Sequence, residues 1–272
     1  MDMLTLNQSA DQTLFFSIVI PVYNRDWCVE RAVMSAVDFL RNCGKRGEIV
    51  LIDDGSSDQS VQVVERLIAE RRDLSMTMRL LRHAVNRGVC AAKNSGAFAA
   101  AGAWIIFLDS DDELIGAAAP AVVTALKLGQ SNPLHFFACV DETGAVSKVP
   151  TALSRGTLVT LLTTGTGGEA LPVVRAEVFR SCPYDEDIRG YESLSYLRIL
   201  RATPFFILHS LVARRYYVLH ADRLSSRAGM KRRTRDLRLG HMRVLREHWS
   251  VMSPAALVKQ ALRVLKATVW GY

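Results

Sequence analysis

The sequence lacks the features of a membrane-spanning, secreted or disulfide-bonded protein. Its longest run without a charged residue, residues 94–108, is shorter than the roughly 20 apolar residues that cross a bilayer. The N-terminal segment carries Asp2 and Asp11 but no basic start followed by an apolar run, so no secretory signal is expected. The five cysteines are scattered without a Cys-x-x-Cys pair. We therefore expect reduced thiols that serve as small core residues in a cytoplasmic protein.

Two common nucleotide-binding signatures are also missing. The first predicted strand runs into PVYNRD, which is neither the G-x-G-x-x-G of dinucleotide-binding dehydrogenases nor the glycine-rich phosphate loop that a nucleotidyltransferase needs. The composition, 49% hydrophobic and 22% charged, is ordinary for a soluble globular protein and excludes disordered and fibrous classes. A chain of 272 residues is long enough to bury a large core without structural metals or disulfides.

Charge is distributed unevenly along the chain. Residues 1–140 hold 13 Lys and Arg against 16 Asp and Glu, a net charge of −3. Residues 193–272 hold 16 against 3, a net charge of +13. Such a basic tail predicts an anionic partner: nucleic acid, a phospholipid surface or a phosphorylated substrate. Because the tail has neither interleaved aromatic residues nor a known nucleic-acid motif, we expect no nucleic-acid partner. A solvated basic face without a partner is the alternative.

Short β-rich runs alternate with helical patterns through the first half of the chain. This alternation is typical of βαβ units and of a parallel sheet. The predicted strands span residues 16–22, 48–52, 76–81 and 104–108. Helices are predicted between them, and the side chains of Asp26 and Asp58 are candidate N-caps for the first two.

The pattern loosens after about residue 130. It predicts a hairpin of residues 134–140 and 145–149, strands at 169–174 and 212–219, and a helix at 191–201. Two basic helices are predicted from Lys231 onward, with a break near Ser253 and Pro254. Because no linker separates the halves, we expect one α/β domain that carries a basic helical C-terminal extension.

Polar clusters follow three of the early strands. They are Tyr23-Asn24-Arg25, Asp53-Asp54-Gly55-Ser56 and Asp109 to Glu113. Ligands of parallel α/β sheets bind beyond the carboxyl ends of the strands, so these clusters are expected to lie at a binding site. In the third cluster, Asp109, Asp111 and Asp112 repel one another unless a cation offsets them. Their hard oxygen ligands suit Mg²⁺ or Mn²⁺, and a solvated acidic turn is the alternative.

Four segments, in this order and spacing, resemble the family 2 glycosyltransferases of the GT-A fold. They read SIVIPVYNR, EIVLIDDGSSDQS, NRGVCAAKNSGA and WIIFLDSDDEL. The resemblance is close over residues 16–128 and loose over 165–222. It implies a Rossmann-like, mostly parallel central sheet flanked by helices. The implied organisation is an N-terminal extension at 1–14, a GT-A domain at 15–230 and basic helices at 231–272. That domain divides into a nucleotide-sugar half, 15–128, and an acceptor half, 129–230.

The resemblance implies roles for residues at the strand ends. Pro21 and Tyr23 would line the nucleobase pocket, and Asp54, with Asp53 beside it, would accept a hydrogen bond from a base N–H (uracil in many members). Asp109 and Asp111 resemble the pair that holds the ribose and the metal bridging the diphosphate, and Asp112 shares that region. The other nucleotide-sugar contacts that the resemblance implies are Asn24, Arg25, Lys93, Asn94 and Ser110.

Lys93 departs from the family pattern, which usually has arginine at that position. Lysine keeps the positive charge for the diphosphate or sugar but loses the bidentate fork of a guanidinium. The family also commonly has Glu-Asp, with the Asp as catalytic base, where this chain has Glu192 followed by Ser193. Glu192 is therefore our candidate base, with Asp185 and Asp187 as alternatives. A carboxylate that merely stabilises a helix N-terminus is the other interpretation of Glu192.

Three basic or metal-binding residues follow the last predicted strand. His220 resembles a histidine that completes the metal shell in some members of the family, although a structural histidine is the alternative. Arg223 and Arg227 would neutralise the leaving diphosphate.

The resemblance implies an inverting, Mn²⁺- or Mg²⁺-dependent glycosyltransferase that uses a nucleotide-sugar donor, such as a UDP-sugar. Its acceptor would be a glycan or a lipid-linked oligosaccharide of cell-surface polysaccharide synthesis. Ser193 leaves open a non-catalytic nucleotide-sugar-binding or scaffold protein. The implied location is cytoplasmic and peripheral on the inner face of the cell membrane.

The end of the chain also predicts membrane contact. Apolar residues recur there at helical spacing beside Lys259, Arg263 and Lys266, and Trp270 and Tyr272 follow them. The apolar positions are Ala256, Leu257, Ala261, Leu262, Leu265 and Val269. This pattern is typical of a helix that lies in a membrane interface. A helix whose apolar side packs on the catalytic domain is the alternative.

Overall fold

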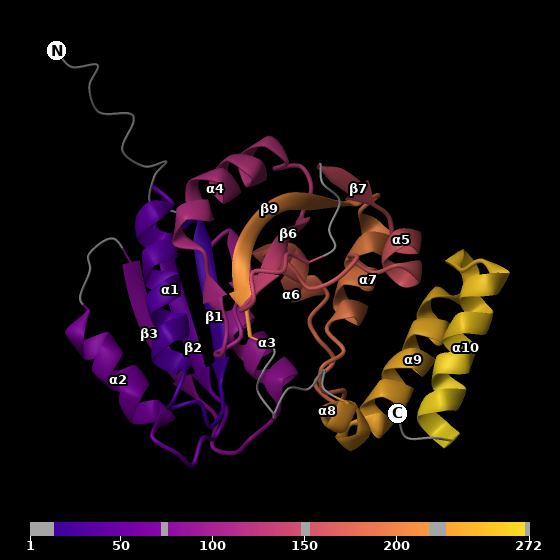
Figure 1. Cartoon of the computed structure of the whole chain (residues 1–272), viewed down its shortest axis with the longest axis horizontal. Coiled ribbons are helices and arrows are strands. Elements are labelled where there is room, and N and C mark those ends of the chain that lie inside the picture. Colours follow the sequence, from indigo (N-terminus) through magenta and orange to yellow (C-terminus); the bar gives the residue numbers. More distant parts are fainter. Residues whose placement is uncertain (1–13, 72–75, 148–152, 218–226, 270–272) are drawn as a thin grey trace.

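The structure, a computed structural model, describes residues 14–71, 76–147, 153–217 and 227–269. These residues form a nine-stranded mixed sheet with the order β3-β2-β1-β4-β8-β6-β9-β5, and β7 pairs with β9 at one end (Figure 1). Helices cover both faces of the sheet. The expected class, an α/β protein with a mostly parallel sheet in its first half, is confirmed.

Four parallel strands carry the first half of the sheet. They are β1 (Phe16–Val22), β2 (Gly47–Asp53), β3 (Met76–Arg82) and β4 (Trp104–Phe107). Every residue of β1 and β2 is buried, because helices lie on both faces, and this is why their sequences are continuous apolar runs. The predicted strands are confirmed to within one residue at each end. The parallel pairing brings the carboxyl ends of β1, β2 and β4 to one edge of the sheet.

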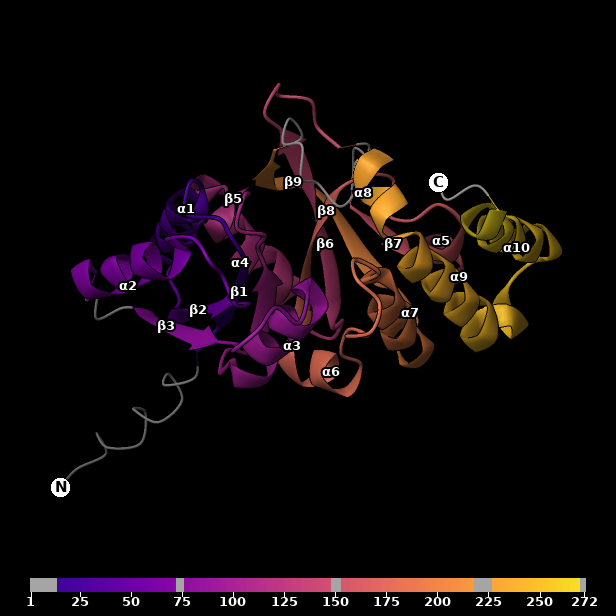
Figure 2. The same ribbon diagram turned by 90° about the horizontal axis from the view of Figure 1, so that it is seen from below.

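Two hydrophobic cores sandwich the sheet (Figure 2). One contains residues of α1 (Val29–Asn42), α2 (Ser60–Glu70) and α4 (Ala119–Leu128), with the short helix η1 (Gly116–Ala118) before α4. The other contains residues of α3 (Val89–Ala99), α6 (Ala176–Ser181) and α7 (Ser193–Ala202). Alternate residues of β1 enter opposite cores, since successive strand side chains point to opposite faces.

The predicted cap of the first helix is wrong. Cys28 occupies the N-cap position of α1, and no side chain caps that helix end. Asp26 lies too far before the helix; its carboxylate instead accepts a hydrogen bond from the backbone of Gln59, at 3.4 Å. The predicted cap of the second helix is wrong too, because Gln59 occupies the N-cap position of α2 and no side chain caps it. The Asp58 carboxylate accepts from the backbone N–H of Ser60, the first residue of α2, at 3.0 Å. The two aspartates thus join the starts of α1 and α2.

The second half adds antiparallel pairing to the sheet. β8 (Ala170–Arg175) lies antiparallel to both β4 and β6 (Leu134–Asp141), and β6 is parallel to β9 (Phe206–Tyr216). The remaining elements are β5 (Glu113–Leu114), β7 (Ser154–Gly156) and α5 (Leu158–Thr163). The second arm of the predicted hairpin is reduced, within the described residues, to one bridge between Val140 and Val146.

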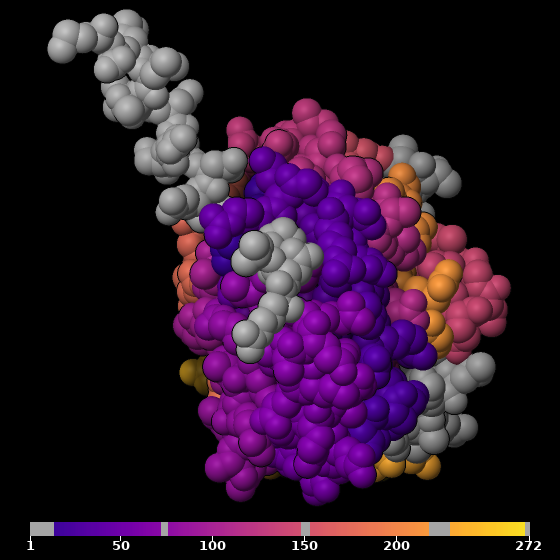
Figure 3. All heavy atoms as spheres, turned by 90° about the vertical axis from the view of Figure 1, so that its left-hand side faces the viewer, coloured from indigo at the N-terminus to yellow at the C-terminus, as the bar shows by residue number. Residues whose placement is uncertain are grey.

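The C-terminal region is helical, as predicted. α8 (Arg227–Arg232) and α9 (Thr234–His248) are followed by the short helix η2 (Trp249–Val251) and by α10 (Pro254–Val269). α9 and α10 lie side by side at the edge of the molecule farthest from α1 and α2 (Figures 1 and 2). The opposite side of the molecule is formed mainly by the indigo to purple segments of the first half (Figure 3). No helix among the described residues is long and apolar enough to span a bilayer.

Candidate active site

A cavity of about 620 Å³ lies beyond the carboxyl ends of β1, β2 and β4, with residues of both halves in its wall. The structure brings together there most of the residues that the sequence singled out. These are Pro21, Tyr23, Arg25, Asp54, Lys93, Asp109, Ser110, Asp111 and Glu192. The parallel strands deliver the first-half residues to one edge, and the loop before α7 supplies Glu192 from the other side.

Lys93 connects the two halves of the cavity. It is 7% exposed, and its Nζ lies 2.9 Å from Asp109 Oδ1 and 3.4 Å from Glu192 Oε1. Burial by itself disfavours the charged ammonium, but the carboxylates of Asp109 and Glu192 outweigh it and raise the pKa of Lys93. Burial likewise acts against the Asp109 carboxylate, yet Lys93 holds its pKa below the ordinary value. One lysine therefore holds the predicted metal ligand and the predicted base close together.

The acidic loop after β4 is crowded with negative charge. Asp112 is buried, and its Oδ2 lies 3.4 Å from Nη1 of Arg214 on β9. Burial, together with the charges of Asp109 and Asp111, raises the pKa of Asp112 to about 7, although Arg214 acts in the opposite direction. The raised pKa of Asp112 thus arises first from burial and then from the two neighbouring carboxylates.

The cavity carries oxygen ligands of the kind that Mg²⁺ and Mn²⁺ prefer. No group of three or more His, Cys, Asp and Glu side chains among the described residues could hold a metal by itself. Asp109 and Asp111, however, both line the cavity. Two carboxylates fit an ion whose remaining ligands are water and substrate phosphates. His220, the third predicted ligand, lies outside the described residues.

The predicted nucleobase end of the cavity contains Pro21, Tyr23 and Asp54. The Asp54 carboxylate accepts hydrogen bonds from the backbone N–H groups of Arg87 and Gly88, at 2.9 and 2.7 Å. Its Oδ1 also lies 2.7 Å from Nδ1 of His83. Asp54 thus fixes the turn before α3, in which Gly88 has a positive φ of 95° that favours glycine. The contact of Asp54 with a nucleobase stays a prediction.

Three predicted contact residues lie outside the cavity wall and hold turns instead. Asp53 Oδ1 accepts from the backbone of Ser56, and Asn24 Oδ1 accepts from the backbone of Ser57. Asn94 pairs with the backbone of Tyr184 through both its amide oxygen and its amide nitrogen. These side chains shape the site, and their predicted contacts with the nucleotide-sugar stay predictions.

The alternative bases are already engaged with arginines. Asp185 pairs with Arg198 at 3.0 Å and with Arg243 at 3.2 Å. Asp187 pairs with Arg243 at 2.6 Å, a contact that lowers its pKa. Neither aspartate is among the residues that line the cavity. This geometry favours Glu192 as the base.

The two predicted diphosphate-binding arginines cannot be placed against the cavity. Arg223 lies outside the described residues, and Arg227 is known only as the first residue of α8.

Sequence reasoning missed several residues in the wall of the cavity. Arg214 is buried and pairs with Asp112 and, at 2.9 Å, with Glu169 just before β8. Arg233 Nη1 donates to the backbone oxygen of Gly190 at 2.7 Å and so anchors the loop that carries Glu192. The others include Arg189, Tyr184 and Tyr196, and the two tyrosine hydroxyls are hydrogen bonded to each other. The available signal for Arg214 was an arginine pair, Arg214 and Arg215, within an otherwise largely apolar strand.

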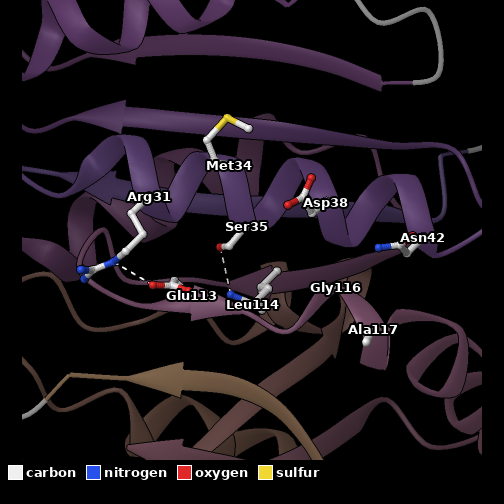
Figure 4. Close-up of a pocket in the computed structure, with 9 residues that line it drawn as sticks. All are labelled: Arg31, Met34, Ser35, Asp38, Asn42, Glu113, Leu114, Gly116 and Ala117. Carbon is white, nitrogen blue, oxygen red and sulfur yellow. Dashed lines mark hydrogen bonds and ion pairs between the residues drawn. The ribbon is translucent and has the colours of Figure 1, made fainter. Parts of the chain in front are cut away.

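A second hollow, of about 420 Å³, runs along α1 (Figure 4). In its wall, Arg31 Nε lies 2.9 Å from Glu113 Oε1, and Ser35 Oγ accepts from the backbone N–H of Leu114 at 3.0 Å. Arg31 also donates to the backbone oxygen of Asp111 at 2.7 Å. These contacts hold β5 and the acidic loop against α1. The residues around this hollow therefore have a structural role in supporting the main cavity.

The architecture and part of the sequence are similar to those of known proteins. The mixed sheet is that of the GT-A fold: the solved structure of S. aureus TarS 1-349 in complex with UDP-GlcNAc superposes with a TM-score of 0.65 at 15% identity, over 94% of this chain and 72% of TarS 1-349. Residues 17–134 match the model of the family "Glycosyl transferase family 2". The chain is therefore similar to the family 2 glycosyltransferases over these residues.

Two curated relatives illustrate the similarity. One is the GalNAc(5)-diNAcBac-PP-undecaprenol beta-1,3-glucosyltransferase of Campylobacter jejuni, 26% identical over 200 residues that cover 70% of this chain and 61% of the relative. The other is the dolichyl-phosphate beta-glucosyltransferase of Saccharomyces cerevisiae, 33% identical over 103 residues, or 37% of this chain and 31% of the relative. The matched regions thus span between about a third and three-fifths of these relatives.

Proposed function

We propose that the protein is an inverting, metal-dependent glycosyltransferase that moves a sugar from a nucleotide-diphosphate donor, a UDP-sugar, to an acceptor hydroxyl. The observation that carries the proposal is the contact of one buried lysine, Lys93, with both Asp109 and Glu192 in a single cavity. The likeness to a structure solved with UDP-GlcNAc supports the choice of donor.

The proposed step makes one bond and breaks one. The acceptor oxygen attacks the anomeric carbon while the bond from that carbon to the diphosphate oxygen breaks, and the diphosphate leaves with the electron pair. Glu192 takes the proton of the acceptor hydroxyl, and Lys93 holds its carboxylate in place. Asp109 and Asp111 would hold Mn²⁺ or Mg²⁺, which supplies Lewis-acid stabilisation of the leaving diphosphate when bound.

For the acceptor we propose a lipid-linked saccharide of cell-surface polysaccharide synthesis, with the protein peripheral on the inner face of the membrane. Two relatives carry undecaprenol and dolichyl phosphate in their names, which supports this class of acceptor. The net charge of residues 193–272, with 16 Lys and Arg against 3 Asp and Glu, suits an anionic surface or a phosphorylated lipid.

Nucleotide release from UDP-sugars in the presence of Mn²⁺ tests the proposal. We expect Asp111→Ala to abolish release, whereas Asp38→Ala, an exposed aspartate on α1 outside the main cavity, leaves it intact. Unchanged Mn²⁺-dependent release by the Asp111 variant would contradict the metal assignment.

The serine at position 193 gives a second candidate, a non-catalytic nucleotide-sugar-binding or scaffold protein. Tight UDP-sugar binding by the wild type without release, with any glycan or lipid-linked acceptor supplied, would favour that candidate.

A further inference from the structure

Helix α10 exposes an unusual amount of apolar surface. Among its residues only Gln260 and Ala267 are buried. Val258, Leu262, Leu265 and Val269 are 60, 58, 53 and 59% exposed. Their spacing of three or four residues places them on one face of the helix, which we call the apolar stripe.

The side of α10 opposite the stripe attaches the helix to the protein. The buried Gln260 lies there, and its Nε2 is 3.1 Å from Nδ1 of His241 on α9. α10 packs on α9 (Figures 1 and 2), and Lys259 Nζ also donates to the backbone oxygen of Thr163, the last residue of α5, at 3.3 Å. The four residues of the stripe are each more than half exposed, so the stripe faces solvent. The alternative in which the apolar side of this helix packs on the catalytic domain is therefore wrong. Trp270 and Tyr272 lie outside the described residues.

Positive charge borders the stripe. At 100° per residue, Lys266 and Lys259 lie along one edge of the stripe. Arg263 lies beyond them, nearer the buried side of the helix, and its Nη1 donates to Gln260 Oε1 at 3.1 Å. The sequence of α10 contains no Asp or Glu. Trp249, 64% exposed in the connection before α10, adds an aromatic side chain of the type enriched at membrane interfaces. An apolar face with a purely basic edge complements an anionic lipid surface.

Self-association of the stripe is the main competing use, because its spacing also fits a coiled-coil seam. With Leu262 and Val269 at position a of a heptad, and Val258 and Leu265 at d, both e positions are lysines, Lys259 and Lys266. The g positions are Ala261 and Thr268, so no acidic residue is available to pair with these lysines across a second copy. Charge therefore favours lipid over a second α10.

We propose that α10 docks on an anionic phospholipid surface, with the apolar stripe at the boundary of headgroups and acyl chains and Lys259 and Lys266 among the headgroups. Such binding adds buried apolar area to electrostatic attraction, and it weakens as salt screens the charges. The proposal does not depend on sugar transfer, because no residue of α10 lines the cavity.

Flotation of the full chain with phosphatidylcholine vesicles, with and without phosphatidylglycerol, tests the proposal. The variants are Leu262→Asp with Leu265→Asp in the stripe, and Lys259→Gln with Lys266→Gln at its edge. Lys127→Gln and Leu128→Asp are the matched controls, since both residues are exposed on α4. Each lysine near anionic lipid contributes about 1 kcal/mol, or about fivefold in affinity, so the double lysine variant should bind about 25-fold more weakly.

The expected pattern is wild-type and control binding to anionic vesicles only, and loss of binding by the stripe variant with its thermal unfolding unchanged. Absence of wild-type binding, or equal binding by the stripe variant, would overturn the proposal. A dimer in solution that the stripe variant dissociates would overturn it in favour of a second copy. Nucleotide release without vesicles should be the same for all these variants, which keeps this test separate from that of the transfer activity.

Discussion

The two halves of the molecule bury different titratable side chains. Among the described residues, the buried carboxylates Glu48, Asp53, Asp54 and Asp112 all lie in the first half, together with one buried cation, Lys93. The buried histidines and Arg214 all lie after residue 134, and burial lowers the pKa of these histidines. Two ion pairs cross between the halves at the cavity: Asp112 with Arg214, and Lys93 with Glu192. The first half therefore contributes a buried carboxylate and a buried ammonium to the site, and each has a partner of opposite charge in the second half.

The largest effect is expected from breaking the pair of Lys93 with Glu192. Glu192→Gln removes the proposed base while keeping the shape of the side chain, so turnover should fall by roughly 10²–10⁴-fold with little change in donor affinity. Steady-state rates and UDP-sugar titrations measure the two quantities. The matched control is Glu186→Gln, an exposed carboxylate of the same region that pairs with Arg87. Activity of the Glu192→Gln variant within a few-fold of wild type would mean that another group is the catalytic base.

The second largest effect is expected from Arg214→Met. Removing one partner of a buried ion pair leaves the other unpaired, which typically costs about 3–5 kcal/mol of unfolding free energy. Because the pKa of Asp112 is already raised to about 7, protonation of that carboxyl should limit the loss to about 3 kcal/mol. Urea unfolding measures this value.

A double variant shows whether the lost stability comes from the pair of Asp112 with Arg214, which joins the two halves. Asp112→Asn added to Arg214→Met removes the unpaired carboxylate, and it should recover at least about 1 kcal/mol of the lost stability. Strict additivity of the two changes would mean that Arg214 acts through Glu169 alone, within the second half.

The sequence predicted the first half of the site better than the second for a physical reason. In the first half, Tyr23, Asp54 and Asp109 each follow a strand end, so a local pattern locates them together, whereas Lys93 lies on α3 and its role came from the family resemblance. Arg214 and Glu169 acquire meaning only through contacts with distant residues. The predicted hairpin is short for a similar reason, because β6 pairs mainly with β8 and β9 and meets the neighbouring segment only at the Val140–Val146 bridge.

A third prediction concerns the buried imidazoles of the second half. Burial lowers the pKa of His135, His209 and His241 to about 4 from an ordinary value of 6.5. Between these values the unfolded chain binds more protons than the folded one. Stability is therefore complete above pH 6.5 and falls as the pH is lowered toward 4. Each histidine contributes a slope of up to about 1.4 kcal/mol per pH unit.

Urea unfolding at several pH values between 7 and 5 tests this slope. His241→Gln should reduce the dependence of stability on pH by the contribution of one histidine. The first-half variant Lys127→Gln should leave this dependence unchanged. A flat profile in the wild type would mean that the folded protein protonates these imidazoles as readily as the unfolded chain does.

The smallest effect separates two aspartates of the first half that the sequence treats alike. The carboxylate of Asp58 accepts from the backbone N–H groups of Ser60 and Asp26, at 3.0 and 3.1 Å, so Asp58→Ala should cost about 1 kcal/mol. That of Asp26 accepts one long bond, 3.4 Å, so Asp26→Ala should cost below about 0.5 kcal/mol. Thermal and urea unfolding of both variants measures the difference. A cost for Asp26 equal to that for Asp58 would restore Asp26 as a cap of α1. The expected inequality would show that Asp58, with two shorter hydrogen bonds to the backbone, holds the starts of α1 and α2 more firmly than Asp26 does.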